Sequence, residues 1–496
     1  MINLRIFLLA WLPAVLAAAP AARPNVLMIV LDDLNDWVGH LGGHPQVKTP
    51  HLDALAARGL SFTNAHAGAP VCNPSRITVM TGRRPSSLGI YLNDTRWHEA
   101  YPGILSIPLH FKNQGYRVVG GGKVNHHMPG FNRRSDWHDY FDQVFDSPYQ
   151  QRVAEGGDVR NFSWPAGFPR NGLEAVRALA KPPQNASEFD WGPFDRRDEE
   201  MGDGRLAEWI AGFLARPPAE PFFLAAGIYR PHLPWYAPRK YFEMYPKDSL
   251  IPPPIKADDC DDLPAGGQRM AADRRGDYEL VMREGRYLDV LQAYLANITY
   301  GDALVGRLIA ALDASPAAAN TIVVVWSDHG WHLGEKHHWR KFALWEEATK
   351  APFMWVVPGV TKPNTLCERT VDFMSIFPTL TELCGIPTPA HNEGVSIRRL
   401  LADPKAPWDL PARTTYKFNN HTVRSEGWRY IRYANGDEEL YDEAKDPNEW
   451  TNLAAQPGFA ARKAELAAFL PKTNAPDPSE RAPKEERQAK KRKKDD

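Results

Sequence analysis

The feature that most constrains the fold of this chain is a set of four apolar runs, each of which ends in polar residues. The runs cover residues 25–31, 116–119, 221–226 and 321–326. Continuous apolar runs of this length are typical of strands buried on both faces, as in a parallel sheet covered by helices. Helical patterns lie between the runs, at residues 49–58, 204–214 and 291–312. The sequence therefore predicts an α/β fold.

Chemically capable side chains follow all four runs: Asp32 and Asp33, Lys123 and His126, His232, and Asp328 and His329, in chain order. Open α/β sheets bind ligands at the carboxyl ends of their strands, so we expect one shared site at that edge. Carboxylates from two strands repel each other there unless a cation lies between them. An oxygen-rich site of this kind selects Ca²⁺ or Mg²⁺, for which His329 is an awkward ligand.

Each of these residues also has a purely structural explanation. The aspartate pair could form a strand end and a helix cap, and residues 328–330 could form a plain turn. Lys123, His126, His232 and Lys341 could be solvated or cap-forming side chains. The basic run at residues 335–341 could likewise be an exposed loop. Its proximity to the strand end at Asp328 instead favours an anion clamp, with its second histidine and additional basic residues at the surface.

A second feature is the segment that joins Cys72, Pro74 and Arg76. Pro74 suits the first helical position, and residues 75–81 are predicted to form a short helix that ends at Gly82. Cys72 would then lie at the N-terminus of the helix, where free N–H groups attract anions, with Arg76 on the same face. This arrangement suits a tetrahedral oxyanion such as sulfate or phosphate. Taken alone, Cys72 fits better as a buried core cysteine.

The composition is that of a globular protein, with 496 residues, 43% hydrophobic residues and a net charge of −1. Nothing in it indicates a nucleic-acid partner, and no stretch after the N-terminus suits stable membrane insertion. Residues 1–22 have the charged start, apolar centre and small residues of a secretory signal peptide. We therefore expect an exported protein, periplasmic or secreted, or located in a lysosome-like compartment if eukaryotic.

The four cysteines do not form a disulfide framework. Export permits one bridge, for which Cys367 and Cys384 are the most plausible pair, and Cys72 and Cys260 then have no obvious partners.

The predicted organisation has a large catalytic domain at residues 23–403, a small α+β subdomain at 404–470 and a charged, disordered tail at 471–496. Long irregular insertions at 146–203 and 252–286 are expected either to shape a binding site or to be mobile.

The motifs resemble those of type I sulfatases. Cys72-Asn73-Pro74-Ser75-Arg76, followed by Thr81-Gly82-Arg83, resembles the signature whose cysteine is oxidised to formylglycine (3-oxoalanine). The strand-end blocks and later segments at 376–380 and 439–453 follow in family order over roughly residues 24–455. Asp328-His329, the spacing of Lys123 and His126, and Trp339-x-Lys341 look most like the iduronate-2-sulfatase branch. The resemblance implies an alkaline-phosphatase-like α/β fold, in which a large mixed or parallel sheet is sandwiched by helices, with a small C-terminal α+β subdomain.

The resemblance also implies a mechanism. The Ca²⁺ ligands, with Ca²⁺ preferred to Mg²⁺, would be Asp32, Asp33, formylglycine at position 72, Asp328 and His329. The hydrated formylglycine, acidified by the metal and Arg76, would attack sulfur while Lys123 and Lys341 neutralise the sulfonate oxygens. His232, with Lys341, would protonate the leaving oxygen, and His126 would deprotonate the second hydroxyl to expel sulfate.

The implied partners are a sulfated carbohydrate and a maturation enzyme, either formylglycine-generating or anaerobic sulfatase-maturating. The branch suggests a 2-O-sulfated uronate in a glycosaminoglycan or a marine polysaccharide. Two alternatives stay open: a phosphonate monoester hydrolase or phosphodiesterase of the same superfamily, and a non-catalytic protein that binds sulfated glycans if Cys72 is not matured.

Overall fold

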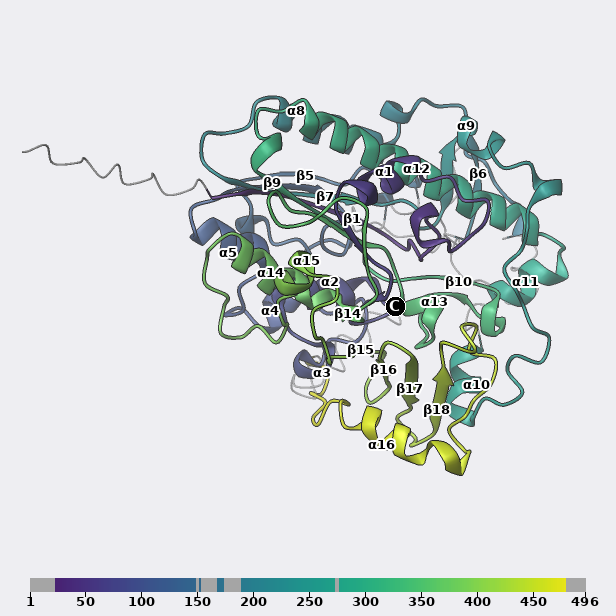
Figure 1. The fold of residues 1–496 in the computed structure, drawn as a ribbon. Helices are drawn as coiled ribbons and strands as arrows, with labels where there is room; N and C mark the ends of the chain where they lie inside the picture. Colours follow the sequence, from purple (N-terminus) through teal and green to yellow (C-terminus); the bar gives the residue numbers. More distant parts are fainter. Residues whose placement is uncertain (1–22, 149–150, 153–166, 174–188, 273–275, 479–496) are drawn as a thin grey trace, which may run out of the picture.

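The computed structural model describes residues 23–148, 151–152, 167–173, 189–272 and 276–478 (Figure 1). The expected signal peptide and residues 479–496 of the expected tail lie outside the described residues. The start of that tail, residues 471–478, is described: the N–H of Ala475 donates to the carbonyl oxygen of Ser86 at 2.7 Å, and the carbonyl oxygen of Ala475 accepts from Tyr91 Oη at 2.7 Å.

An eight-stranded mixed sheet forms the centre of the fold, in the order β13-β2-β12-β9-β1-β7-β4-β5. The four apolar runs are confirmed as its four adjacent central strands, all parallel: β9 (Thr321–Ser327), β1 (Asn25–Leu31), β7 (Phe222–Ile228) and β4 (Arg117–Gly122). The outer strands are β5 (Asp139–Phe141), β12 (Phe353–Val356), β2 (Leu60–Phe62) and β13 (Thr365–Cys367). Antiparallel pairing of β12 with both β9 and β2 makes the sheet mixed.

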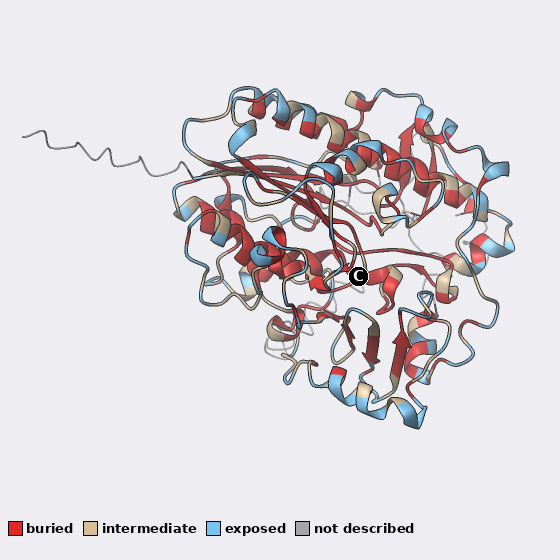
Figure 2. Ribbon diagram, viewed as in Figure 1, coloured by how far each residue is buried: buried red, intermediate tan, exposed pale blue. Residues whose placement is uncertain are grey.

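Helices cover both faces of the sheet (Figure 1). Leu27, Ile29 and Leu31 of β1 join one core cluster, which includes residues of α1 (Pro50–Arg58), α8 (Gly202–Ala215) and α12 (Tyr287–Asp313). The intervening residues of β1 join a second cluster, with α2 (Cys72–Thr81), α5 (Ile107–Asn113), α14 (Ile376–Leu383) and α15 (Arg398–Ala402). Figure 2 shows the strands buried between these layers. Burial on both faces explains why the strands read as continuous apolar runs.

The second run extends further than its apolar residues indicate. Strand β4 continues through three glycines to Gly122, which has a φ of 72°. A Cβ at Gly122 would lie 2.1 Å from the carbonyl oxygen of Gly227 in β7, so this close approach requires glycine.

Helix α2 begins at Cys72 rather than at residue 75, so Pro74 is its third residue and not its first. Proline is tolerated there because the N–H groups of the first turn have no partner within the helix. The helix ends at Gly82, as expected, and this glycine has a left-handed conformation with a φ of 66°.

Smaller elements complete the large domain. The helices are α3 (Pro85–Leu88), α4 (Trp97–Ala100), α9 (Arg239–Glu243), α10 (Ala265–Ala271), α11 (Asp277–Arg283) and α13 (Glu346–Thr349). The paired short strands are β3 (Ala65–His66) with β14 (Val371–Asp372), β6 (Trp191–Phe194) with β8 (Trp235–Pro238), and β10 (His332–Leu333) with β11 (Trp339–Arg340).

An antiparallel sheet follows near the C-terminus, with strands β15 (Ala412–Thr415), β16 (His421–Arg424), β17 (Trp428–Arg432) and β18 (Glu438–Asp442). Helix α16 (Ala460–Ala467) packs on this sheet through Leu466. The C-terminal sheet is joined to the large domain by hydrogen bonds. The buried side chain of Glu346 in α13 accepts them from Arg424 and Arg429.

The expected disulfide is absent, since all four cysteines are free thiols. Cys367 lies 3.5 Å from the carbonyl oxygen of Pro404, and Cys384 contacts Tyr116. The bridge between Cys367 and Cys384, the pair that the sequence favoured without settling, is therefore not formed. Within the described residues, no helix is long and apolar enough to cross a membrane.

Candidate active site at the carboxyl ends of the strands

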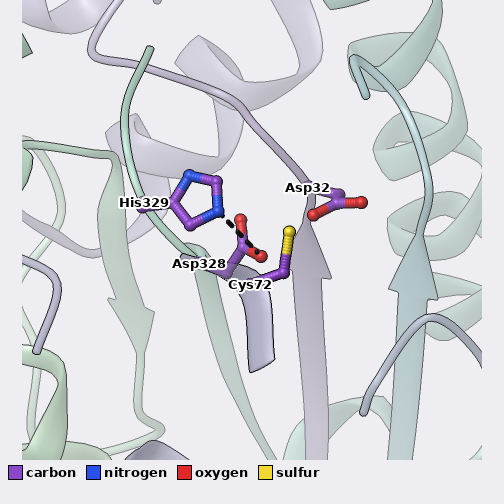
Figure 3. A group of neighbouring side chains, drawn as sticks. All are labelled: Asp32, Cys72, Asp328 and His329. Atoms are coloured by element: carbon purple, nitrogen blue, oxygen red, sulfur yellow. Dashed lines mark ion pairs between the residues drawn. The ribbon is translucent and has the colours of Figure 1, made fainter. Parts of the chain in front are cut away.

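Helix α2 is anchored to the ends of β1 and β9 by a buried arginine. Arg76 donates from Nε to Asp328 Oδ2 at 2.9 Å and from Nη2 to Asp32 Oδ1 at 3.1 Å. Ser75 Oγ also donates to the carbonyl oxygen of Asp328. These contacts hold Cys72, the first residue of α2, beside both strand ends (Figure 3).

The carboxylates and His329 surround the same point. Asp33 has a left-handed φ of 63°, and its N–H donates to Asp328 Oδ1 at 3.1 Å. His329 Nε2 lies 3.4 Å from Asp328 Oδ2 and 3.6 Å from Asp33 Oδ1. A non-glycine residue rarely adopts a positive φ, so Asp33 has a conformation that its surroundings must hold.

Two lysines point at the cysteine sulfur. The Nζ atom of Lys341 lies 3.0 Å from Cys72 Sγ, and that of Lys123 lies 3.7 Å from it. Lys341 also pairs with Asp33, and Lys123 with Asp32. Cys72 is thus fully enclosed by charged groups of both signs.

Burial and the neighbouring charges shift the pKa values of this cluster in different directions. Burial raises the pKa of Asp33 to about 7, an effect that Lys341 only partly offsets, and that of Asp328 to about 6, against the charge of Arg76. Burial also opposes the ionisation of Asp32, yet Lys123 and the other nearby cations hold its pKa well below the usual range. The pKa of the Cys72 thiol rises to about 12, again through burial, despite both lysines.

The donor set fits a divalent cation. One ligand atom from each of Asp32, Cys72, Asp328 and His329 lies within 4.8 Å of the others, and Asp32, Asp33, Cys72 and His232 form a second such group. Asp33 Oδ2 and His329 Nε2 are buried without a hydrogen-bond partner in the described part of the chain. Such orphaned atoms are costly unless a ligand satisfies them, and carboxylate oxygens suit a hard cation.

His232 and His126 lie at the edge of the cluster. His232 Nε2 is 3.7 Å from Asp33 Oδ2, and its Nδ1 lies 2.5 Å from the carbonyl oxygen of Leu233. The His126 ring lies 4.5 Å from that of His127, which lies 6.2 Å from the His232 ring. Burial lowers the pKa of both His126 and His232, which favours neutral imidazoles. His127 was not predicted as a residue of this region, although its place next to His126 in the sequence indicated that it could be one.

The structure thus brings together every site residue expected from the sequence. One expectation about their surroundings is wrong, however, because the basic residues around Lys341 are not at the surface. Lys336, His338 and Arg340 are all buried. They contact residues from the 252–286 segment, whose carboxylates allow the charges to be buried.

The chain resembles known proteins over most of its length. The Sulfatase family model matches residues 24–386, and the model for the C-terminal part of N-sulphoglucosamine sulphohydrolase matches residues 334–475. A sulfatase of Formosa agariphila is 39% identical over 465 residues, covering 91% of this chain and 87% of the relative. The iduronate 2-sulfatase of Mus musculus is 31% identical over 400 residues, covering 74% of this chain and 69% of the relative.

A solved structure of a 2-O GAG sulfatase has the same fold, with a TM-score of 0.66 at 23% identity, and the match covers 90% of this chain and 91% of that one. The expected alkaline-phosphatase-like fold with a C-terminal subdomain is therefore confirmed.

Proposed function

The chain belongs to the sulfatase family, and on that basis we propose that this sulfatase removes sulfate esters from a sulfated polysaccharide or oligosaccharide. A 2-O-sulfated uronate is the proposed target. The likeness to iduronate 2-sulfatase supports this target, and the lysines beside Cys72 suit a sulfate ester in general.

The observation that carries the proposal is the position of Cys72, which begins helix α2 and has Lys341 Nζ 3.0 Å and Lys123 Nζ 3.7 Å from its Sγ. A thiol with a pKa of about 12 is almost entirely protonated at neutral pH, and a protonated thiol is a poor nucleophile. We therefore propose that a formylglycine-generating or anaerobic sulfatase-maturating enzyme converts Cys72 to formylglycine. The hydrated aldehyde would supply a hydroxyl nucleophile and a second hydroxyl that allows sulfate to be released.

The proposed cation is Ca²⁺, preferred to Mg²⁺. Asp32, Asp33, residue 72, Asp328 and His329 would hold it, and it would supply positive charge to the sulfate oxygens.

The protein's own charges complete the site. Arg76, fixed between Asp32 and Asp328, orients residue 72. Lys123 and Lys341 point at the position of the attacking atom and would neutralise the sulfonate oxygens.

Proton transfer is assigned to three side chains. Although burial opposes its charged form, Lys341 has a raised pKa because of Asp33, so it holds a proton at neutral pH. With His232 beside Asp33, it would protonate the leaving sugar oxygen. Burial lowers the pKa of His126, which favours its neutral form, and its Nδ1 has no hydrogen-bond partner within the described residues, so it would accept a proton from the second hydroxyl of residue 72.

The test measures sulfate release across sulfated disaccharides that differ in the sugar and the sulfated position. We expect 2-O-sulfated hexuronate to react fastest, and aryl sulfate to be cleaved faster than aryl phosphonate. Faster cleavage of the phosphonate would instead support a phosphonate monoester hydrolase. Binding of glycan without sulfate release, even after treatment with the maturation enzyme, would support the non-catalytic alternative.

A further inference from the structure

Lys341 follows a short hairpin with an unusual backbone. Strands β10 and β11 pair antiparallel, and Lys341 comes directly after β11. Four residues near it have a positive φ without being glycine, namely Lys336 (54°), His337 (47°), Arg340 (77°) and Phe342 (70°). A positive φ is energetically unfavourable for an L-amino acid other than glycine. The hairpin therefore keeps this backbone conformation only if contacts with its surroundings stabilise it.

Two buried aspartates of the 252–286 segment provide that support. Asp277, the first residue of α11, accepts a hydrogen bond from Arg340 Nε at 2.5 Å. Asp259 accepts hydrogen bonds from Lys336 Nζ at 2.7 Å and from the Lys336 N–H at 3.0 Å. All four side chains are at most 4% exposed, so each pair interacts with little solvent screening.

The same segment also reaches the backbone of Lys341. The ring of His338 bridges two carbonyl oxygens. Its Nε2 lies 2.5 Å from the carbonyl oxygen of Lys341, and its Nδ1 lies 3.1 Å from the carbonyl oxygen of Ala271 in α10. In addition, the ring of His337 stacks on Tyr278 of α11, with centroids 5.5 Å apart and planes 9° apart.

We propose that Asp277, through its pair with Arg340, is a positioning residue that fixes the place of the Lys341 ammonium group beside residue 72. This inference rests on the proposed function. Arg340 is bonded directly to Lys341 in the chain, so the Arg340–Asp277 pair sets the point from which the lysine side chain starts. A lysine side chain is flexible, so it does not fix the position of its ammonium group without further contacts.

Positioning of this kind matters for the rate. Lys341 must hold its charge within contact distance of one atom at position 72, now 3.0 Å away. A displacement of about 1 Å in such a site can reduce the rate by about 100-fold. The 252–286 segment thereby serves the chemistry in addition to any role in substrate choice.

A double-mutant cycle tests the proposal with the matured, full-length enzyme and an aryl sulfate. We expect Asp277→Asn to lower kcat/KM by about 10- to 100-fold, mainly through kcat. In a Lys341→Ala background, the same substitution should cause little further loss, because the group that it positions is gone. The matched control is Asp258→Asn, which changes an exposed aspartate of the same segment that pairs with Lys256.

Binding of inorganic sulfate, measured by calorimetry, gives a readout that does not depend on turnover. Asp277→Asn and Lys341→Ala should each weaken it, and the double variant should bind no more weakly than Lys341→Ala. Equal losses from Asp277→Asn in both backgrounds would overturn the proposal and leave a purely structural role. Wild-type values for Asp277→Asn would overturn it as well.

Further variants and the wild type keep the outcomes distinguishable. If Asp277→Asn does not fold, Arg340→Lys, which keeps the charge but lacks the Nε donor, enters the same cycle with the same expectations. Asp277→Glu, which retains the carboxylate, should recover part of the lost activity. An inactive but matured wild type would instead refute the proposed function itself.

Discussion

The two lysines that point at Cys72 are held by different kinds of structure. Lys123 comes directly after β4, and its backbone N–H donates to the carbonyl oxygen of Gly227 in the adjacent strand at 2.8 Å. Lys341 comes from a hairpin with several positive φ angles that is held by ion pairs to the 252–286 segment. The sheet core therefore fixes one half of the site, and the other half depends on a distant segment of the chain.

This difference has an energetic consequence. The sheet half is supported by apolar clusters on both faces, whose contributions are many and individually modest. The hairpin half is supported by buried ion pairs. Removing one partner of such a pair strongly destabilises the fold, because the other charge is left buried and unpaired. We therefore expect the support beneath Lys341 to be more sensitive to the loss of a single partner than the sheet that supports Lys123.

The largest effect is expected on the sheet side, from Asp32→Ala. The substitution leaves Arg76 and Lys123 buried without this carboxylate and removes a proposed cation ligand. Loss of one buried partner costs about 3–5 kcal/mol in unfolding free energy, and we expect activity to fall below detection. Thermal unfolding and kcat are the measurements. As a control, Asp36→Asn, which breaks a pair with Lys350 outside the cluster, should keep most activity. An Asp32→Ala variant with normal turnover would refute the assignment.

Truncating the lysines compares the two halves directly. Lys123→Ala and Lys341→Ala should each lower kcat by about 10²- to 10³-fold, because each removes one charge that stabilises the transition state. Steady-state kinetics with an aryl sulfate measure the effect. If Lys341→Ala retained wild-type kcat, the Lys341 ammonium group would have no part in catalysis, and the claim that the hairpin forms one half of the active site would be wrong.

Cation binding should depend on pH through the sheet half. Burial raises the pKa of Asp33 to about 7 and that of Asp328 to about 6, so protons and a divalent cation compete for the same oxygens. The rise in Tm on adding Ca²⁺ should be full above pH 7 and lost as the pH falls through 7 and 6. Saturation at 100 times Kd would correspond to about 2.7 kcal/mol. A Ca²⁺-dependent rise in Tm that stays constant from pH 5 to pH 8 would contradict the assigned ligands.

The smallest effect is expected from Cys260→Ser. Cys260 donates a weak hydrogen bond to the carbonyl oxygen of Lys336 at 3.3 Å, and a serine hydroxyl can make the same contact. Activity and Tm should stay close to wild-type values, in contrast to the ion-pair variants of the hairpin. A large loss would show that the hairpin depends on every contact and not chiefly on its two ion pairs.

Much of the sheet half could be predicted because its signals are local. Buried strands are continuously apolar. The residues that follow parallel strands lie at the carboxyl edge of the sheet, however the strands are connected along the chain. The predicted start of α2 was wrong because the missing N–H of Pro74 permits any position in the first turn.

The hairpin half could not be predicted, because burial of Lys336 and Arg340 depends on carboxylates far away in the chain. Asp277 lies 63 residues before Arg340, and Asp259 lies 77 residues before Lys336. A run of lysines, histidines and arginine is typical of an exposed loop when considered alone. The free cysteines likewise follow from tertiary contacts that a spacing pattern does not contain.

The most direct test of the central claim is the mass of the peptide that contains residue 72, taken from enzyme with measured sulfatase activity. We expect the sulfur of Cys72 to be replaced by oxygen with the loss of two hydrogens, and activity to rise with the modified fraction. Cys72→Ser should be inactive or become trapped after one turnover, because a serine cannot eliminate the bound sulfate. Fully active enzyme with only unmodified thiol at position 72 would contradict the account.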